Sequence, residues 1–220
     1  MDIGKSIGFV FEDKDWITKV LIGGIVSLIP IVNLAALGYA LRTLQNVGAG
    51  KAEPLPQWDD FGDYFVRGLV LFVGGLIYAL PLIVVAVMTI ALSSLTDSRA
   101  LGAGAEGVIS VCVAVLACLQ LLLALAVSVW TPAAAMNYAA TDEFAALFRF
   151  DQIWGLISGH LGDYIVALLV YWLVSMVAFF VGVVLCLVGT IFTSFIATLI
   201  FAHLLGQVLS KSREPAPAAA

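Results

Sequence analysis

Charged residues are scarce in this 220-residue chain and absent from four long segments. Only 11% of the residues are Asp, Glu, Lys or Arg, whereas 62% are hydrophobic, and an ordinary soluble domain has roughly a quarter charged residues. About 20 apolar residues in a helix cross a bilayer core, and only helices or closed barrels satisfy their backbone there. The runs lack the period-two alternation of barrel strands, so the sequence predicts an all-α, polytopic transmembrane helix bundle. The uncharged runs are residues 20–41, 68–96, 107–141 and 164–210.

The chain also lacks the features of several other protein classes. Its 10 basic residues against 15 acidic ones give a formal net charge of −5. This balance argues against a nucleic-acid partner, because such a protein carries a basic patch. No phosphate loop, nucleophile–base arrangement or zinc-ligand spacing occurs, so we expect neither catalytic residues nor a metal or other cofactor. The three cysteines fall in apolar runs and are expected to be small buried hydrophobic residues: Cys112, Cys118 and Cys186.

The first apolar run, residues 20–41, contains Pro30 near its middle. If this run crossed the membrane, the basic residues would divide four to six between the two sides. If it instead turns back at Pro30, nine lie on one side and only Arg99 on the other. Because basic residues gather on the cytoplasmic side, the sequence favours a re-entrant helical hairpin, with both termini on the cytoplasmic side of the cell membrane. We expect no cleavable signal, since mixed charge precedes the run and a small-residue cleavage site is missing.

The later runs predict the remaining spans. A single helix over residues 164–210 would be more than twice as long as the bilayer core is thick, so we predict two spans that separate near Gly189. The run 107–141 is long enough to span and then bend at Pro132. The whole of residues 1–210 is predicted to form one transmembrane domain.

Three polar segments are expected to lie outside the spans. Residues 1–19 mix aromatic and charged side chains, which predicts an interfacial segment with Trp16 at headgroup depth. Residues 142–163 carry an apolar stripe and are predicted to form an amphipathic helix along the membrane surface. Residues 211–220 are polar and then rich in Pro and Ala, which predicts a disordered tail.

A Gly-Asp-Tyr triplet occurs twice, one hundred residues apart, as Gly62-Asp63-Tyr64 and Gly162-Asp163-Tyr164. In each triplet we expect the glycine to allow close helix approach and the aspartate, whose charge is costly inside a bilayer, to mark where a span begins. The tyrosine is expected at the interface. Each triplet also follows a run with a proline and then a tyrosine: Pro30 with Tyr39, and Pro132 with Tyr138.

This shared order predicts an internal duplication. The two halves, about residues 16–95 and 107–188, would be parallel repeats, because both triplets begin a span from the same side. A last helix, residues 190–209, would follow them.

Residues 54–64 are the most distinctive stretch of the chain and allow two interpretations. In the structural interpretation, Pro54 and Pro56 hold an extended approach, Asp59 or Asp60 caps a helix, and Trp58 lies in the interface. In the functional one, Asp59, Asp60 and Asp63 have the Asp-Asp-x-x-Asp spacing of a magnesium–diphosphate site in prenyl-transferring enzymes.

A prenyl-transferring enzyme needs a second acidic motif that faces the first. The nearest candidates, Asp142-Glu143 and Asp151, do not repeat the spacing. The structural interpretation of the aspartate cluster is therefore favoured.

A family resemblance covers nearly the whole chain except the tail, and the residues of the first half are its more specific part. Phe11 and Trp16 precede a Gly-Gly pair, and the further matching residues are Ile29-Pro30, Gly38-Tyr39, Arg42 and Leu55-Pro56-x-Trp58-Asp59-Asp60. With these residues the chain resembles the domain-of-unknown-function 4013 family of bacterial and archaeal membrane proteins. Its second half, with Pro132, Tyr138 and Asp142, more loosely resembles the membrane domain attached to some glycerophosphodiester phosphodiesterases. These resemblances imply an all-helical bundle with cytoplasmic amphipathic connectors and no catalytic residues.

Three functions follow from these patterns. The favoured one is a non-enzymatic accessory or scaffolding membrane protein, in contact with lipids and with a membrane-protein partner or further copies of itself. A transporter or lipid-handling protein for a neutral or apolar molecule is the first alternative. Ion coupling is disfavoured, because the apolar runs hold no Asp, Glu, Lys or Arg, and the lone His203 is expected to be a hydrogen-bonded structural residue. A membrane enzyme that uses Asp59, Asp60 and Asp63 is the second alternative.

Overall fold

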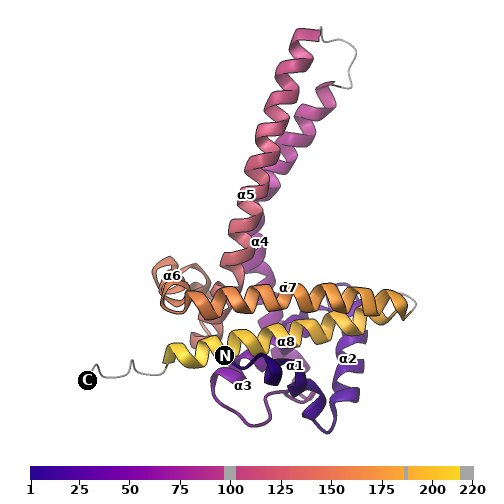
Figure 1. Cartoon of the computed structure of the whole chain (residues 1–220), viewed down its shortest axis with the longest axis vertical. Coiled ribbons are helices and arrows are strands. Elements are labelled where there is room, and N and C mark those ends of the chain that lie inside the picture. Colours follow the sequence, from indigo (N-terminus) through magenta and orange to yellow (C-terminus); the bar gives the residue numbers. More distant parts are fainter. Residues whose placement is uncertain (97–102, 186–187, 214–220) are drawn as a thin grey trace. The chain divides into compact units, whose positions relative to one another are not determined.

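The computed structural model describes residues 1–96, 103–185 and 188–213. Over these residues the chain is all-α, with eight α-helices, one 3-10 helix and no strand, as the apolar runs predict (Figure 1). In chain order the elements are α1 (Ile3–Glu12), α2 (Trp16–Leu28), α3 (Leu34–Gly48), α4 (Phe61–Thr96), α5 (Ala103–Thr141), the 3-10 helix η1 (Phe144–Phe148), α6 (Phe150–Gly159), α7 (Leu161–Val184) and α8 (Val188–Arg213).

Four of the described helices, α4, α5, α7 and α8, are long and apolar enough to cross a membrane. The chain is therefore a multi-pass membrane protein, as its composition predicts. The run 164–210 separates into α7 and α8 as predicted, with Gly189 in the first turn of α8. Residues 186 and 187 between these helices, including Cys186, lie outside the described residues, as do Arg99 and residues 214–220.

The chain divides into two compact units, Met1–Val73 with Pro132–Ala220, and Gly74–Thr131. In the first unit α8 is the central helix, and α1, α2, α3, α6 and α7 all contact it. Of the most apolar stretch of α8, 44% is buried, against none for α5, so the core of the protein lies around α8. The division does not follow the predicted halves, and their duplication stays a prediction.

The second unit consists of the adjoining parts of α4 and α5, which Trp130 links by donating its indole N–H to the Tyr78 hydroxyl at 3.3 Å. Their surfaces are almost wholly apolar and exposed, as expected of helices that face lipid. Cys112 and Cys118 of α5 are exposed and free. The prediction that these two cysteines are buried is therefore wrong, because in this unit the protein does not cover the apolar helix surface.

The first apolar run is divided into two helices by a turn at Pro30, as predicted, and the re-entry of these helices into the membrane stays a prediction. The helix α2 ends at Leu28, a turn contains Pro30 and Ile31, and α3 begins at Leu34. Ile31 has φ 73°, a left-handed conformation that breaks the helix. Since α2 has 13 residues, it is about 20 Å long and shorter than the roughly 30 Å bilayer core.

The helices α3 and α4 approach each other at two glycines. A Cβ atom added to Gly38 would lie 1.8 Å from the Tyr64 carbonyl oxygen, and one added to Gly68 would lie 1.7 Å from the Leu34 carbonyl oxygen. Any larger residue would separate the two backbones. By contrast, nothing lies within 4 Å of a Cβ added to Gly62 or Gly162, so the prediction that the triplet glycines allow close approach is wrong.

Two of the predicted segment boundaries differ from those of the structure. Residues 142–163 form η1, α6 and the start of α7 rather than one amphipathic helix, because the backbone departs from helical angles at Arg149 and at His160. Within this segment Ile153 and Ile157 are buried, whereas Trp154 is 62% exposed. The helix α8 continues to Arg213, so the tail begins after the predicted Lys211.

Candidate functional site

The proline-rich segment 54–57 is held by four side chains from separate parts of the chain. The Asn46 amide donates to the Pro54 carbonyl at 2.9 Å, and the Lys19 ammonium donates to the Leu55 carbonyl at 3.1 Å. The hydroxyls of Tyr39 and Tyr64 donate to the next two carbonyls, those of Pro56 and Gln57, at 2.8 Å and 2.6 Å. Four consecutive carbonyls of an extended segment thus find partners without a β-sheet or helix, as buried backbone requires.

An aromatic cluster covers this segment. Tyr39 stacks on Trp58 with ring centroids 4.3 Å apart and an interplanar angle of 13°. Tyr64 meets both rings edge-on, at 5.6 Å and 5.8 Å, and Phe195 of α8 lies 5.9 Å from Tyr39. The Trp58 indole donates to the Lys19 carbonyl at 3.0 Å. The structure therefore brings together Tyr39, Pro56, Trp58 and Tyr64, four residues that the sequence singled out, in a structural cluster.

The three aspartates of the predicted magnesium motif take separate roles. Asp60 accepts a hydrogen bond from the Asp63 backbone N–H at 3.3 Å, as a helix cap does. Asp63 forms an ion pair with Arg67 at 2.6 Å, and Asp59 is exposed. Among the described residues no group of three His, Cys, Asp or Glu side chains is placed to hold a metal ion.

Arg67 is the centre of a polar network that sequence reasoning missed. Its Nε donates to Asp63, and its two terminal nitrogens donate to the two carboxylate oxygens of Asp142, which follows α5. Gln45 of α3 adds a hydrogen bond to Asp142 at 3.0 Å. The arginine is 15% exposed, so much of it is withdrawn from water. The signal in the sequence was a lone arginine four residues after Asp63, the spacing of a helical ion pair.

Asp142 itself has unusual backbone and charge properties. Its φ is 58°, a left-handed conformation that aspartate tolerates better than most residues. Burial raises the pKa of its carboxyl, but the hydrogen bonds from Arg67 and Gln45 to the charged form outweigh this. The pKa of Asp142 consequently lies below its ordinary value of 3.8.

The second triplet has a different set of partners. Asp163 accepts from the Lys211 ammonium of α8 at 2.7 Å and lies 4.0 Å from the amino terminus of Met1. Tyr164 is buried and hydrogen-bonds the backbone of Ala133, next to Pro132. Gly162 lies in the open first turn of α7.

The other residues singled out in the sequence lie apart from these clusters. Trp16 begins α2 and meets Phe11 edge-on at 5.0 Å. Pro30 is exposed in the turn between α2 and α3, and Pro132 lies within α5, whose helix continues past it.

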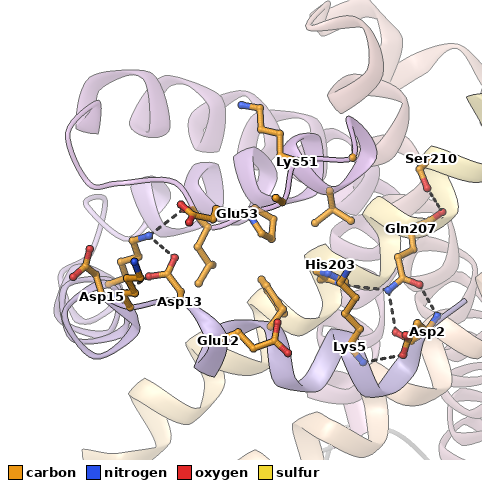
Figure 2. A pocket seen from close by; sticks show the side chains of 18 of the residues that line it. Asp2, Lys5, Glu12, Asp13, Asp15, Lys51, Glu53, His203, Gln207 and Ser210 are labelled. Carbon is orange, nitrogen blue, oxygen red and sulfur yellow. Dashed lines mark hydrogen bonds and ion pairs between the residues drawn. The ribbon is translucent and has the colours of Figure 1, made fainter.

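A polar hollow of about 630 Å³ lies between α1, the segment after α3, and the end of α8 (Figure 2). Charges of both signs line it, and sequence reasoning did not foresee it, because its walls are far apart in the chain. Lys19, 4% exposed, forms an ion pair with Asp13 at 2.6 Å beside it. The lining residues are Asp2, Lys5, Phe9, Glu12, Asp13, Lys14, Asp15, Lys19, Val47, Gly50, Lys51, Ala52, Glu53, Pro54, Leu55, Gln57, His203, Gln207 and Ser210.

His203, at one wall of this hollow, links α8 to α1. Its Nδ1 lies 2.9 Å from the Ser6 hydroxyl oxygen, and the Gln207 amide donates to the same oxygen at 2.9 Å. The distance is that of a nucleophile–base pair, but Ser6 is fully buried and donates to the Asp2 carbonyl at 3.0 Å. The pair therefore joins two helices and exposes no nucleophile, which agrees with the structural role expected for His203.

Comparison with known proteins identifies a family and nothing more specific. No curated protein and no solved structure matches the chain. The distant resemblance to the phosphodiesterase membrane domain thus stays a prediction. The model of the family described as "Protein of unknown function (DUF4013)" matches residues 22–187. This match includes Tyr39, Trp58 and Tyr64 of the aromatic cluster but not α1 or α8. The chain is therefore a member of the DUF4013 family of proteins of unknown function.

Proposed function

We propose that this protein is a non-enzymatic scaffolding or accessory protein of the cell membrane. The observation that carries the proposal is the set of four hydrogen bonds to the carbonyls of residues 54–57. The most distinctive residues of the chain thereby fix the path of a connecting segment and the packing of α3, α4 and α8. A catalytic role is not needed to explain why tyrosines, prolines and a tryptophan stand at these positions.

The proposed orientation has both termini in the cytoplasm. Four helices of spanning length give an even number of crossings, and α2 is too short to add a fifth. Nine basic residues then share one side, which the positive-inside rule assigns to the cytoplasm. Reporter fusions at each end test this: both are expected to report the cytoplasm, and opposite sides would contradict the orientation.

A scaffolding role predicts a protein partner. The tagged protein is purified in a mild detergent, and co-purifying proteins and lipids are identified by mass spectrometry, with an unrelated four-span protein purified in parallel as the control. We expect a membrane protein, or a second copy of this chain, in stoichiometric amount. If only lipid or a small apolar molecule co-purifies in that amount, the scaffolding role is contradicted.

One observation favours a lipid-handling function as the second candidate. An almost wholly apolar groove of about 400 Å³ lies between α1 and the α7–α8 pair, with Ile7 and Phe11 on one side and Val177 and Ile196 on the other. Its chemistry suits an acyl chain. Co-purification of stoichiometric lipid and no partner protein would favour this candidate.

A further inference from the structure

The polar hollow between α1, the segment after α3, and α8 holds charges that the protein does not neutralise. Lys5 and Lys51 line it together with Glu12 and Glu53. Within the described part of the chain none of these four side chains has an ion-pair partner. Figure 2 shows Lys5, Glu12 and Glu53 around this space, and Lys51 at its edge with the amino group turned outward. A ligand that carries a positive and a negative group would meet a partner for each in this hollow.

His203 adds an unmatched polar atom to the wall. The residue is 97% buried, being 3% exposed, and Phe9 packs on its ring with centroids 4.3 Å apart. Its Nδ1 is used by Ser6 and Gln207, whereas no described residue hydrogen-bonds its Nε2. This nitrogen is not among the described polar atoms that are both sealed and unpartnered, and His203 lines the hollow. A ligand in the hollow would supply a hydrogen-bond partner for this nitrogen.

The helix α1 places this hollow at the level of lipid headgroups. Ile3, Ile7 and Phe11 recur every four residues and are exposed on one face of α1. Such a stripe buries itself at the boundary between headgroups and acyl chains. Lys5 and Glu12, on the same helix, line the polar hollow. A headgroup beside α1 would thus be within reach of the hollow.

We propose that this hollow binds a zwitterionic phosphoethanolamine group, supplied by the headgroup of a membrane phospholipid. The ammonium of Lys5 pairs with the phosphate, and the exposed side chain of Lys51 turns inward from the edge of the hollow to pair with it as well, since lysine binds phosphate as a point charge. The carboxylates of Glu12 and Glu53 accept N–H bonds from the primary ammonium. The volume of about 630 Å³ lies in the range of small-ligand sites.

The chemistry of the walls selects a primary amine over a quaternary one. A quaternary ammonium has no N–H to donate and is recognised by aromatic cages. Among the described residues, the aromatic rings that line the hollow are those of Phe9 and His203, which pack on each other at an interplanar angle of 33° and form no cage. A primary ammonium, by contrast, has three N–H donors for carboxylates. The test of this site does not depend on the scaffolding proposal.

The test measures the melting temperature of the purified full-length chain in detergent with added lipid. Phosphatidylethanolamine, phosphatidylcholine and phosphatidylglycerol with the same acyl chains are compared. We expect phosphatidylethanolamine to raise the melting temperature by about 5 °C at saturation, and the other two lipids to raise it by less than half as much. Equal shifts for all three headgroups would overturn the proposal.

Two charge-neutral double variants localise the effect. Lys51→Gln with Glu53→Gln removes one charge of each sign from exposed positions outside the helices, so the fold and the melting temperature without lipid should persist. This variant is expected to lose the phosphatidylethanolamine-specific increment. The control, Glu143→Gln with Arg149→Gln, removes one charge of each sign at exposed positions that do not line the hollow, and should keep it.

A further measurement with soluble phosphoethanolamine tests whether the bound group comes from a lipid headgroup. The melting-temperature shift that it causes is compared with the shift caused by phosphatidylethanolamine. A shift with the lipid and none with the soluble compound would support a membrane headgroup. A shift of similar size with both would show that the phosphoethanolamine group alone suffices, which supports the chemistry of the site but not its lipid source. Retention of the lipid-specific shift by Lys51→Gln with Glu53→Gln would overturn the assignment.

Discussion

The two Gly-Asp-Tyr triplets occupy matching local positions and have different partners. Both aspartates are the third residue of a long apolar helix, α4 or α7, and both following tyrosines are buried. Asp63 pairs with Arg67 within its own helix, whereas Asp163 pairs with Lys211, 48 residues away on α8. The comparison shows that a short motif fixes where a helix begins, while the surrounding helices choose what its charge contacts.

Among the variants considered, alanine substitutions at glycines should give the largest difference in stability. Gly38→Ala is expected to destabilise the protein by about 3 kcal/mol or more, because the new methyl group would meet the Tyr64 carbonyl oxygen of α4. Gly62→Ala and Gly162→Ala, which have open space around them, serve as matched controls and should change stability by less than about 1 kcal/mol. Unfolding in detergent by increasing denaturant measures all three. A tolerated Gly38→Ala would show that α3 and α4 do not pack as described.

Removing the cation from each triplet's ion pair should give the next largest effect. Arg67→Gln is expected to cost about 2 kcal/mol, since a largely buried arginine loses charge-assisted hydrogen bonds to Asp63 and Asp142. Lys211→Gln should cost about 1 kcal/mol or less, because Lys211 and Asp163 are 39% and 29% exposed. If the two variants lost the same free energy of unfolding in this assay, the proposed difference between the triplets would be contradicted.

The pH dependence of stability tests the Asp142 contact, with a smaller effect. Because the pKa of Asp142 in the folded protein lies below 3.8, its stabilising contribution is complete above the ordinary pKa and fades as the pH falls through the folded value. Melting temperatures are measured between pH 7 and pH 3. The melting temperature of the native protein should decrease once the pH is lowered below about 4. The Asp142→Asn variant should have a lower melting temperature than the native protein at pH 7. Its melting temperature should decrease less than that of the native protein when the pH is lowered. A variant whose loss on acidification matches that of the native protein would count against this contact.

The smallest expected effect concerns magnesium and the first triplet. Since Asp63 is engaged by Arg67 and Asp60 caps α4, millimolar magnesium should leave the melting temperature of the native protein unchanged, as it should that of Asp63→Asn. A magnesium-dependent rise in the native protein that Asp63→Asn lacks would instead favour the enzyme alternative. Calcium at the same concentration controls for ionic strength.

Much of the fold could be predicted from local patterns. Pro30 predicted the break of the first apolar run into two helices, and the length of the run 164–210 predicted two helices there. The exposed cysteines of α5 could not be predicted, because an apolar run reads the same whether protein or lipid covers it. The sequence pattern singled out Tyr39, Trp58 and Tyr64. It did not predict that all three pack around the same extended segment.

The membrane class, the all-helical fold and the break of the first apolar run at Pro30 could all be predicted from the sequence. These properties depend on hydropathy, charge and proline within a single segment, and each is local to the chain. The tertiary structure alone decided that Ser6 meets His203, 197 residues away, that Arg67 reaches Asp142, and that a hollow with charges of both signs opens beside α1. Such contacts depend on how each helix is rotated and placed against α8, and no segment carries that information alone.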